Sequence, residues 1–116
     1  MAEIIIKNLV LRTIVGINED ERKKKQEVIV NIKFETEPDL AIQSDNIADT
    51  VNYRSLTKKI IYAAENSNFS LLEKLTDFIL QIVMEDKRIL KATVRVDKRH
   101  VLRFTESVAV ELSAKK

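Results

Sequence analysis

The fold is specified most clearly by the stretch Val28-Ile29-Val30-Asn31-Ile32-Lys33-Phe34-Glu35. Every second residue, starting with valine 28, is apolar, and the residues between them are mostly polar. Successive side chains of a β-strand point to opposite faces, so this alternation predicts a strand with one buried face.

Working outward from this stretch, three more segments have strand character and two have apolar residues at helical spacing. The predicted strands cover residues 3–15, 28–35, 90–97 and 107–113, and the predicted helices cover 53–64 and 71–83. Residues 37–49 have no clear period and are expected to be a long connection. The order β-β-α-α-β-β predicts an α+β fold, a four-stranded antiparallel sheet with both helices on one face.

Length and composition limit the classes of protein to consider. The 116 residues suit a single domain over 1–116. There is no apolar run near the about 20 residues needed to span a bilayer, and Met1-Ala2-Glu3-Ile4 lacks the basic region of a secretory signal. We therefore expect a cytoplasmic protein without a membrane partner.

The charge balance gives little support for nucleic-acid binding. Twenty Lys and Arg against eighteen Asp and Glu leave a formal charge of +2. The one basic run, 22–25, is flanked by acidic residues, which is typical of a solvated loop. A non-enzymatic binding module that uses this run to touch nucleic acid remains the alternative from another class.

Metal and phosphate-loop chemistry have few candidate residues. His100 is the sole histidine and there is no cysteine, so paired imidazole or thiolate ligands are excluded, and we expect no metal site. Gly16 is the only glycine, which excludes a glycine-rich phosphate loop. Gly16 stands where the first strand is expected to end, a place where the backbone has no room for a side chain.

Four polar residues at predicted element ends each have an ordinary interpretation. In Ser70-Leu71-Leu72-Glu73, Glu73 has the spacing of a capping box with Ser70. Tyr53 suits an amphipathic core position, Lys98 an exposed strand edge, and Glu21 a charged turn. From the residues alone, two hypotheses stay open: each residue has its ordinary structural role, or the four residues together form a ligand site.

The predicted sheet also indicates self-association. A single layer leaves two edge strands and one uncovered face, on which Ile29 and Ala109 are expected. Exposed edges and apolar patches favour pairing with other subunits, so we expect a homo-oligomer.

Nearly end to end, the chain resembles the dihydroneopterin aldolase superfamily, and within it the branch of triphosphate 2′-epimerases. Each motif is short, and their order and spacing carry the resemblance. The motifs are Ile6-Lys7-Asn8-Leu9, Val15-Gly16-Ile17, Glu21 with Gln26, Ser44-Asp45-Asn46-Ile47, Thr50-Val51-Asn52-Tyr53-Arg54, Phe69-Ser70-Leu71-Leu72-Glu73-Lys74-Leu75 and Asp97-Lys98-Arg99-His100-Val101-Leu102-Arg103-Phe104.

The resemblance implies the tunnelling fold, a β-β-α-α-β-β unit whose sheets join into a barrel. Four subunits would form a ring and two rings an octamer, with active sites between neighbouring subunits. The implied ligand is a small pterin. The implied pocket has Glu73 as the anchor of the pterin ring, the backbone of Leu72 beside it, and Thr50, Val51 and Asn52 from an adjoining subunit.

The resemblance also implies a cofactor-free retro-aldol reaction. Lys98 would act with a water in proton transfer, Tyr53 would assist at the side-chain hydroxyls, and Glu21 matches an acid of the aldolase site. Both cleavage to an aldehyde and epimerisation at C2′ can follow from this chemistry.

Two features favour the epimerase over the aldolase. Lys98 is followed by Arg99 rather than by the proline typical of aldolases, and Val15 stands where many aldolases carry histidine. Cations for a triphosphate tail would come from Arg99, His100, Arg103 and Arg54. The aldolase of folate synthesis is the alternative.

Overall fold

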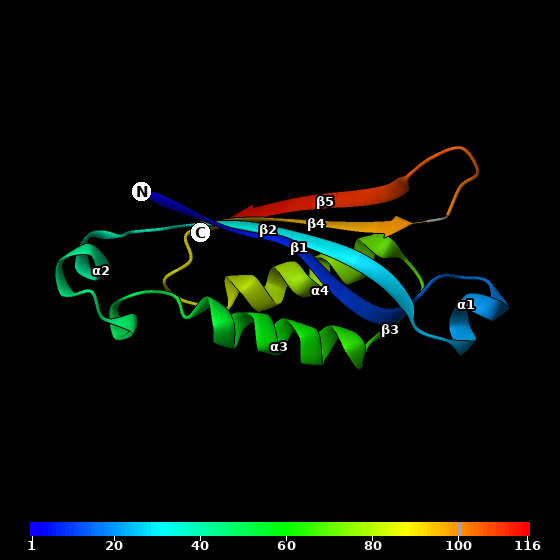
Figure 1. Cartoon of the computed structure of the whole chain (residues 1–116), viewed down its shortest axis with the longest axis horizontal. Helices are drawn as coiled ribbons and strands as arrows, with labels where there is room; N and C mark the ends of the chain where they lie inside the picture. The colour runs from blue at the N-terminus through cyan, green and yellow to red at the C-terminus, as the bar shows by residue number, and fades with distance from the viewer. Residues whose placement is uncertain (100) are drawn as a thin grey trace.

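A computed structural model describes residues 1–99 and 101–116. A curved sheet forms one layer, and the two long helices lie along one of its faces (Figure 1). This arrangement confirms the predicted α+β class and the placement of both helices on one side. The strands are β1 (Ala2–Val15), β2 (Gln26–Thr36), β3 (Asn68–Phe69), β4 (Lys91–Arg99) and β5 (Ser107–Lys115). The helices are α1 (Glu19–Lys23), α2 (Asp39–Ser44), the 3-10 helix η1 (Ile47–Asp49), α3 (Tyr53–Glu65) and α4 (Leu72–Met84).

The order of strands across the sheet is β3-β1-β2-β4-β5. The pairs β1–β2, β2–β4 and β4–β5 are antiparallel. In this register Lys98 lies opposite Val28 on one side and Val108 on the other. Paired residues share a face, so the side chain of Lys98 lies on the helix-covered face together with the buried Val28.

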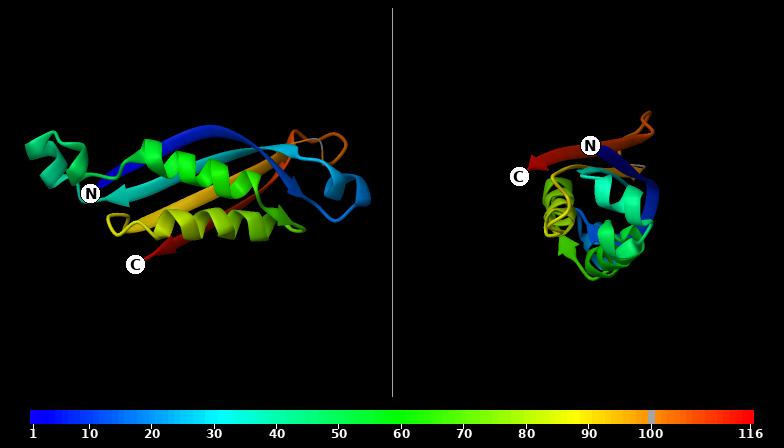
Figure 2. Two further views of the ribbon diagram at one scale, coloured as in Figure 1. Left: turned by 90° about the horizontal axis from the view of Figure 1, so that it is seen from below. Right: turned by 90° about the vertical axis from the view of Figure 1, so that its left-hand side faces the viewer.

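The sheet bends at an irregularity in β1. The register with β2 shifts between Ile6 and Leu9, and Asn8 has a positive φ of 54°. Asparagine tolerates this left-handed conformation. Here the Asn8 N–H also donates to the Asn31 side-chain oxygen at 2.8 Å. Such bulges increase local twist, which suits the curvature visible in Figure 2.

The core lies between the sheet and helices α3 and α4, which run side by side beneath it (Figure 2). The alternating residues predicted for 28–35 supply one wall, and the apolar faces of the helices supply the other. Burying one large apolar side chain stabilises the fold by about 1.5–3 kcal/mol, so this layer is the main source of stability. The core includes Leu11, Val28, Val30, Ile32, Phe34, Leu56, Ile60, Leu75, Ile79, Val83, Val94 and Val96.

The prediction of four strands was wrong, because the sheet has five. The additional strand β3 has only two residues and pairs in parallel with Ile14 and Val15 at the end of β1. Two residues are too few to show an alternating pattern. Strand β3 fixes the start of α4 beside the end of β1, and both of these segments contribute to the site described below.

Two segments predicted to be irregular contain short helices. The predicted connection 37–49 contains α2 and η1, and the charged turn contains α1. None of these helices has a buried residue, so they carry no apolar periodicity for sequence analysis to detect.

The face of the sheet opposite the helices has no covering layer among the described residues. Ala109 is exposed and Ile29 is partly buried on this face, and Ile5 and Val10 of β1 are exposed there as well. Among residues 1–99 and 101–116, no helix has the length and apolar character needed to cross a membrane.

Candidate active site

Lys98 is the only charged residue that is buried in the described part of the chain. It is 7% exposed, and its amine donates a hydrogen bond to the Val15 carbonyl at 2.8 Å. It also forms an ion pair with the Glu21 carboxylate. A buried charge is costly unless it is paired and hydrogen-bonded. The interpretation of Lys98 as an exposed edge lysine was therefore wrong.

Glu21 reaches Lys98 from α1, across 77 positions of sequence. Its other carboxylate oxygen accepts a hydrogen bond from the Asn18 N–H at 3.3 Å. The hydrogen bond from Lys98 holds the pKa of the Glu21 carboxyl below its ordinary value, with a smaller contribution from Asn18. The carboxyl is therefore ionised at neutral pH and acts as the counter-charge of the buried amine.

Gly16 makes room for this pair. Its φ is +147°, a conformation that side chains rarely adopt, and a Cβ atom there would collide with the Glu21 carboxylate. The expectation that this backbone has no room for a side chain is confirmed. The obstructing group is the carboxylate of Glu21, which sequence analysis did not connect with Gly16.

A hollow of about 620 Å³ opens beside the Lys98–Glu21 pair. Its walls come from the loop after β1, from α1, from the end of β4 and from the loop that begins α4. Leu72 lines it, as do Ser70 and Leu71. The structure thus brings together three of the predicted site residues, Lys98, Glu21 and Leu72.

Glu73 lies next to this wall on the first turn of α4 and is exposed. The capping box predicted for it was wrong, because the N-cap residue is Leu71 and no side chain caps the helix. Within residues 1–99 and 101–116, the Glu73 carboxylate has neither a hydrogen-bond partner nor an ion-pair partner. Its carboxylate is therefore available to an external donor.

The remaining predicted residues lie at the opposite end of the helix layer. Thr50 and Asn52 line a second hollow of about 560 Å³, which the last turn of α4 also lines. Asn52 caps α3, with its side chain accepting from the Ser55 N–H at 3.1 Å. Val51, between them, is buried and does not line this hollow.

Tyr53 is 56% exposed, so the core position predicted for it was wrong. It lies at the start of α3, which shares the second hollow with Ile82 and Glu85 at the end of α4. Lys98 lies near the start of α4, beside Leu72. The two groups of predicted residues are thus about one 13-residue helix, or roughly 20 Å, apart. A single chain does not assemble them into one pocket.

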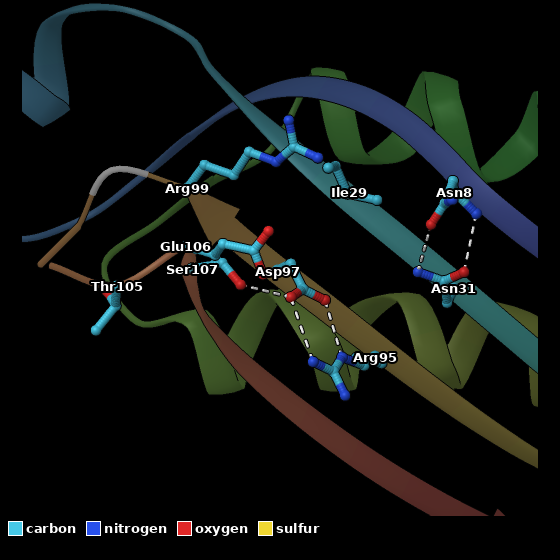
Figure 3. Close-up of a pocket in the computed structure, with 9 residues that line it drawn as sticks. All are labelled: Asn8, Ile29, Asn31, Arg95, Asp97, Arg99, Thr105, Glu106 and Ser107. Atoms are coloured by element: carbon cyan, nitrogen blue, oxygen red, sulfur yellow. Dashed lines mark hydrogen bonds and ion pairs between the residues drawn. The ribbon is translucent and has the colours of Figure 1, made fainter.

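The predicted phosphate-binding cations are dispersed. Arg99 lines the Lys98 hollow and also a third hollow on the helix-free face, over which its side chain extends (Figure 3). In that third hollow Arg95 donates to Asp97 at 2.9 Å and Ser107 donates to Asp97 at 2.8 Å. These bonds, Arg95 first, hold the pKa of Asp97 below its ordinary value.

Two of the other predicted cations, Arg103 and Arg54, line neither of the hollows that Arg99 lines. Arg103 stacks on Phe104 at 5.3 Å, and Arg54 is exposed at the far end. The prediction for His100 lies outside the described residues.

The chain is similar over most of its length to proteins of one known family. The family model described as "FolB: Dihydroneopterin aldolase" matches residues 4–113. The dihydroneopterin triphosphate 2′-epimerase of Escherichia coli K12 is 46% identical over 112 residues, covering 97% of this chain and 93% of that protein. The same enzyme of Pseudomonas aeruginosa is 43% identical over 113 residues, covering 97% and 92%. The dihydroneopterin aldolase of Escherichia coli K12 is 21% identical over 81 residues, covering 70% and 66%.

Solved structures agree on the fold. Escherichia coli dihydroneopterin aldolase in complex with neopterin superposes with a TM-score of 0.92 at 18% identity, covering 98% of this chain and 99% of that one. A Burkholderia dihydroneopterin aldolase bound to guanine gives 0.84 at 17% identity, covering 99% and 91%. The chain therefore has the fold of a dihydroneopterin aldolase. With the match over residues 4–113, the chain belongs to the dihydroneopterin aldolase family.

Proposed function

We propose that this protein is a cofactor-free pterin enzyme that epimerises 7,8-dihydroneopterin triphosphate at C2′, giving the dihydromonapterin form. The observation that carries the proposal is the buried Lys98 amine, paired with Glu21 and facing a hollow lined by Leu72. A buried titratable pair in a cleft is typical of catalytic sites. We also propose that the protein acts in the cytoplasm.

The chemistry proceeds by breaking and re-forming one bond. Removal of the proton from the 2′-hydroxyl lets the C1′–C2′ bond break, and the electron pair of that bond passes into the dihydropterin ring through its imine nitrogen. The ring is the electron sink, so Lys98 forms no Schiff base. The aldehyde fragment then turns and re-adds to C1′ through its other face, which inverts C2′.

In this reaction Lys98 moves protons, and Glu21 holds the Lys98 amine in place. Lys98 acts with a water between the amine and the substrate oxygens. Positioned acid–base groups of this kind supply about 10²–10⁴-fold each. Tyr53 assists at the side-chain hydroxyls.

Recognition of the pterin is assigned to the start of α4. The exposed Glu73 carboxylate can accept two adjacent N–H groups of the pterin ring side by side. The backbone of Leu72 contacts the same ring. Since Thr50, Val51 and Asn52 lie at the other end of the chain, the pocket is completed by those residues of an adjoining subunit, in a ring of four or a stacked pair of rings.

The epimerase is preferred to the aldolase because of sequence similarity. Identity to the two epimerases is 46% and 43% over nearly the full length, against 21% to the Escherichia coli aldolase. The family as a whole bears the aldolase name, and the first half of the reaction is the same. Release of the aldehyde before it re-adds would give the aldolase outcome, so aldolase activity is the second candidate.

The test offers dihydroneopterin and its triphosphate separately and resolves the 2′-epimer from released hydroxymethyl-dihydropterin. Epimer formed from the triphosphate is the expected main product, and dominant cleavage of the unphosphorylated substrate would replace the proposal with the aldolase.

In both assays Lys98→Ala should lower kcat by about 10²–10⁴-fold. Lys91→Ala removes an exposed lysine from the same strand and should leave kcat unchanged. Parental turnover by Lys98→Ala would refute the proposed mechanism.

A further inference from the structure

Arg22 belongs to the basic run 22–25, which was predicted to be a solvated loop, but it is half-buried. One guanidinium nitrogen donates to the Phe69 carbonyl at 2.9 Å and to the Gly16 carbonyl at 3.4 Å. Its neighbour Lys23 is exposed, and its side chain has no hydrogen bond in the described part of the chain. The prediction was therefore wrong for Arg22.

The two carbonyls that Arg22 contacts belong to segments that build the candidate site. Phe69 is the last residue of β3 and directly precedes Ser70, Leu71 and Leu72, which line the hollow. Gly16 follows β1, and its N–H also donates to the Phe69 carbonyl, at 3.1 Å. One carbonyl group thus joins the end of β1, helix α1 and the loop that begins α4.

Helix α1 depends on polar contacts for its position. It has five residues and none of them is buried, so it has no apolar anchor on the body of the protein. A helix this short is not stable by itself. Side-chain bonds from its adjacent residues Glu21 and Arg22 tie it to two different elements, β4 and β3.

We propose that Arg22 is a positioning residue: by fastening α1 to the Phe69 and Gly16 carbonyls, it holds the Glu21 carboxylate against Lys98. It also keeps this pair at a fixed place relative to the loop at Leu72. Only the kinetic part of the proposal rests on the proposed function, because the placement of Glu21 can be measured without substrate.

The groups that face the Glu21 carboxyl limit what else can affect it. Lys98 faces it from β4, and Gln26 of β2, Asp20, Lys24 and Arg99 line the same hollow. The hydrogen bond from Lys98 is the largest cause of its lowered pKa, and Arg22 is not among the causes. Release of Arg22 therefore raises the pKa of Glu21 by loosening its contact with Lys98, not by removing a nearby charge.

The closing experiment compares Arg22→Met with Lys23→Met, which remove the same charge and leave the same apolar stem at adjacent positions. The pKa of Glu21 is followed by carbon NMR of its side-chain carboxyl, with Glu21→Gln used to assign the signal. In Arg22→Met the pKa should rise toward the ordinary value of 4.5. Lys23→Met should leave it as in the parent. Arg22→Lys keeps the charge, but its amine ends one bond short of the Arg22 nitrogen that reaches both carbonyls, so the pKa should rise here too.

Kinetics supply the second measurement, with whichever of the two pterins the parent turns over. Arg22→Met should lower kcat by about tenfold, the size of loss that follows a small misplacement of a reacting group. The acid limb of its kcat profile should move to higher pH. In a Glu21→Gln background, Arg22→Met should cause little further loss of kcat, because it acts through Glu21.

An unchanged Glu21 pKa in Arg22→Met, or the same rise in Lys23→Met, would overturn the proposal. Additive losses of kcat in the double variant would overturn it as well. If Arg22→Met does not fold, Arg22→Lys decides by the same two measurements. If the parent turns over neither pterin, the proposed function fails, and the NMR comparison still decides the role of Arg22.

Discussion

The two ends of the helix layer each hold a lysine–glutamate ion pair, and the pairs differ in their surroundings. In the Lys98–Glu21 pair the side chains are 9% and 23% exposed, and the lysine also bonds a backbone carbonyl. In the Lys59–Glu85 pair, at 2.7 Å, they are 57% and 60% exposed. Exposed pairs contribute about 0–1 kcal/mol, whereas a charge buried away from water depends on its partner.

The buried Lys98–Glu21 pair is therefore the more costly of the two to form, and several features of the chain hold it in place. At the Lys98 end, a five-residue helix, a glycine of unusual φ and the guanidinium of Arg22 all hold one carboxylate in place. At the Asn52 end, a capping residue and an exposed tyrosine lie at the surface of a second hollow. Under the proposed function, the first end supplies the proton-transfer group, and the second end would complete the pocket of an adjoining subunit.

The largest expected effect comes from Gly16→Ala, which breaks the Lys98 end alone. The new Cβ must displace the Glu21 carboxylate and adopt a strained φ, which costs about 1–3 kcal/mol of unfolding free energy. Turnover should fall nearly to the level of Lys98→Ala. Urea denaturation and the pterin assay measure the two effects. Parental turnover in a folded Gly16→Ala protein would show that Glu21 is not needed where the structure places it.

The next effect tests whether the two ends meet between subunits. Tyr53→Ala should lower kcat by about tenfold, the loss of roughly one hydrogen bond in the transition state. Tyr62, on the same helix and 75% exposed, is the matched control, and Tyr62→Ala should retain parental kcat.

Mixing subunits sharpens this test. When Lys98→Ala and Tyr53→Ala chains are unfolded together and refolded, some sites combine an intact Lys98 end with an intact Tyr53 end. The mixture should then exceed the summed activity of the two variants refolded separately. Activity equal to that sum would argue that both residues serve a site within one chain.

The smallest effect distinguishes the two ion pairs by pH. The pKa of Glu21 is lowered in the folded protein, so the pair stabilises the fold above the unfolded value of about 4.5. That stabilisation is lost as the pH falls from 4.5 through the folded pKa. The difference in unfolding free energy between the parent and Glu21→Gln should therefore shrink over this range.

Glu85→Gln serves as the exposed counterpart. It should change the unfolding free energy at neutral pH by at most about 1 kcal/mol, and added salt should reduce that difference. Denaturation curves of both variants at several pH and salt values make the comparison. A larger effect for Glu85→Gln than for Glu21→Gln would reverse the ranking of the two ends.

The sequence by itself determined the layers of this protein. Alternation in 28–35 and helical spacing in 53–64 and 71–83 reflect burial of one face, which any single chain records as local periodicity. The short motifs around Asn52, Leu72 and Lys98 were enough to identify the family. They named Glu21 as a site residue and placed Lys98 at the end of a strand.

Only the tertiary structure decided which of these residues meet. The Lys98–Glu21 pair spans 77 positions, and the Val15 carbonyl that completes it lies 83 positions from Lys98. Helix α1 has no apolar pattern, because the polar contacts of Glu21 and Arg22 with distant segments hold it. Strand β3 has only two residues and is too short to show a pattern, although Phe69 packs on Phe78. Local periodicity records burial, but it does not record which distant side chains share a hydrogen bond.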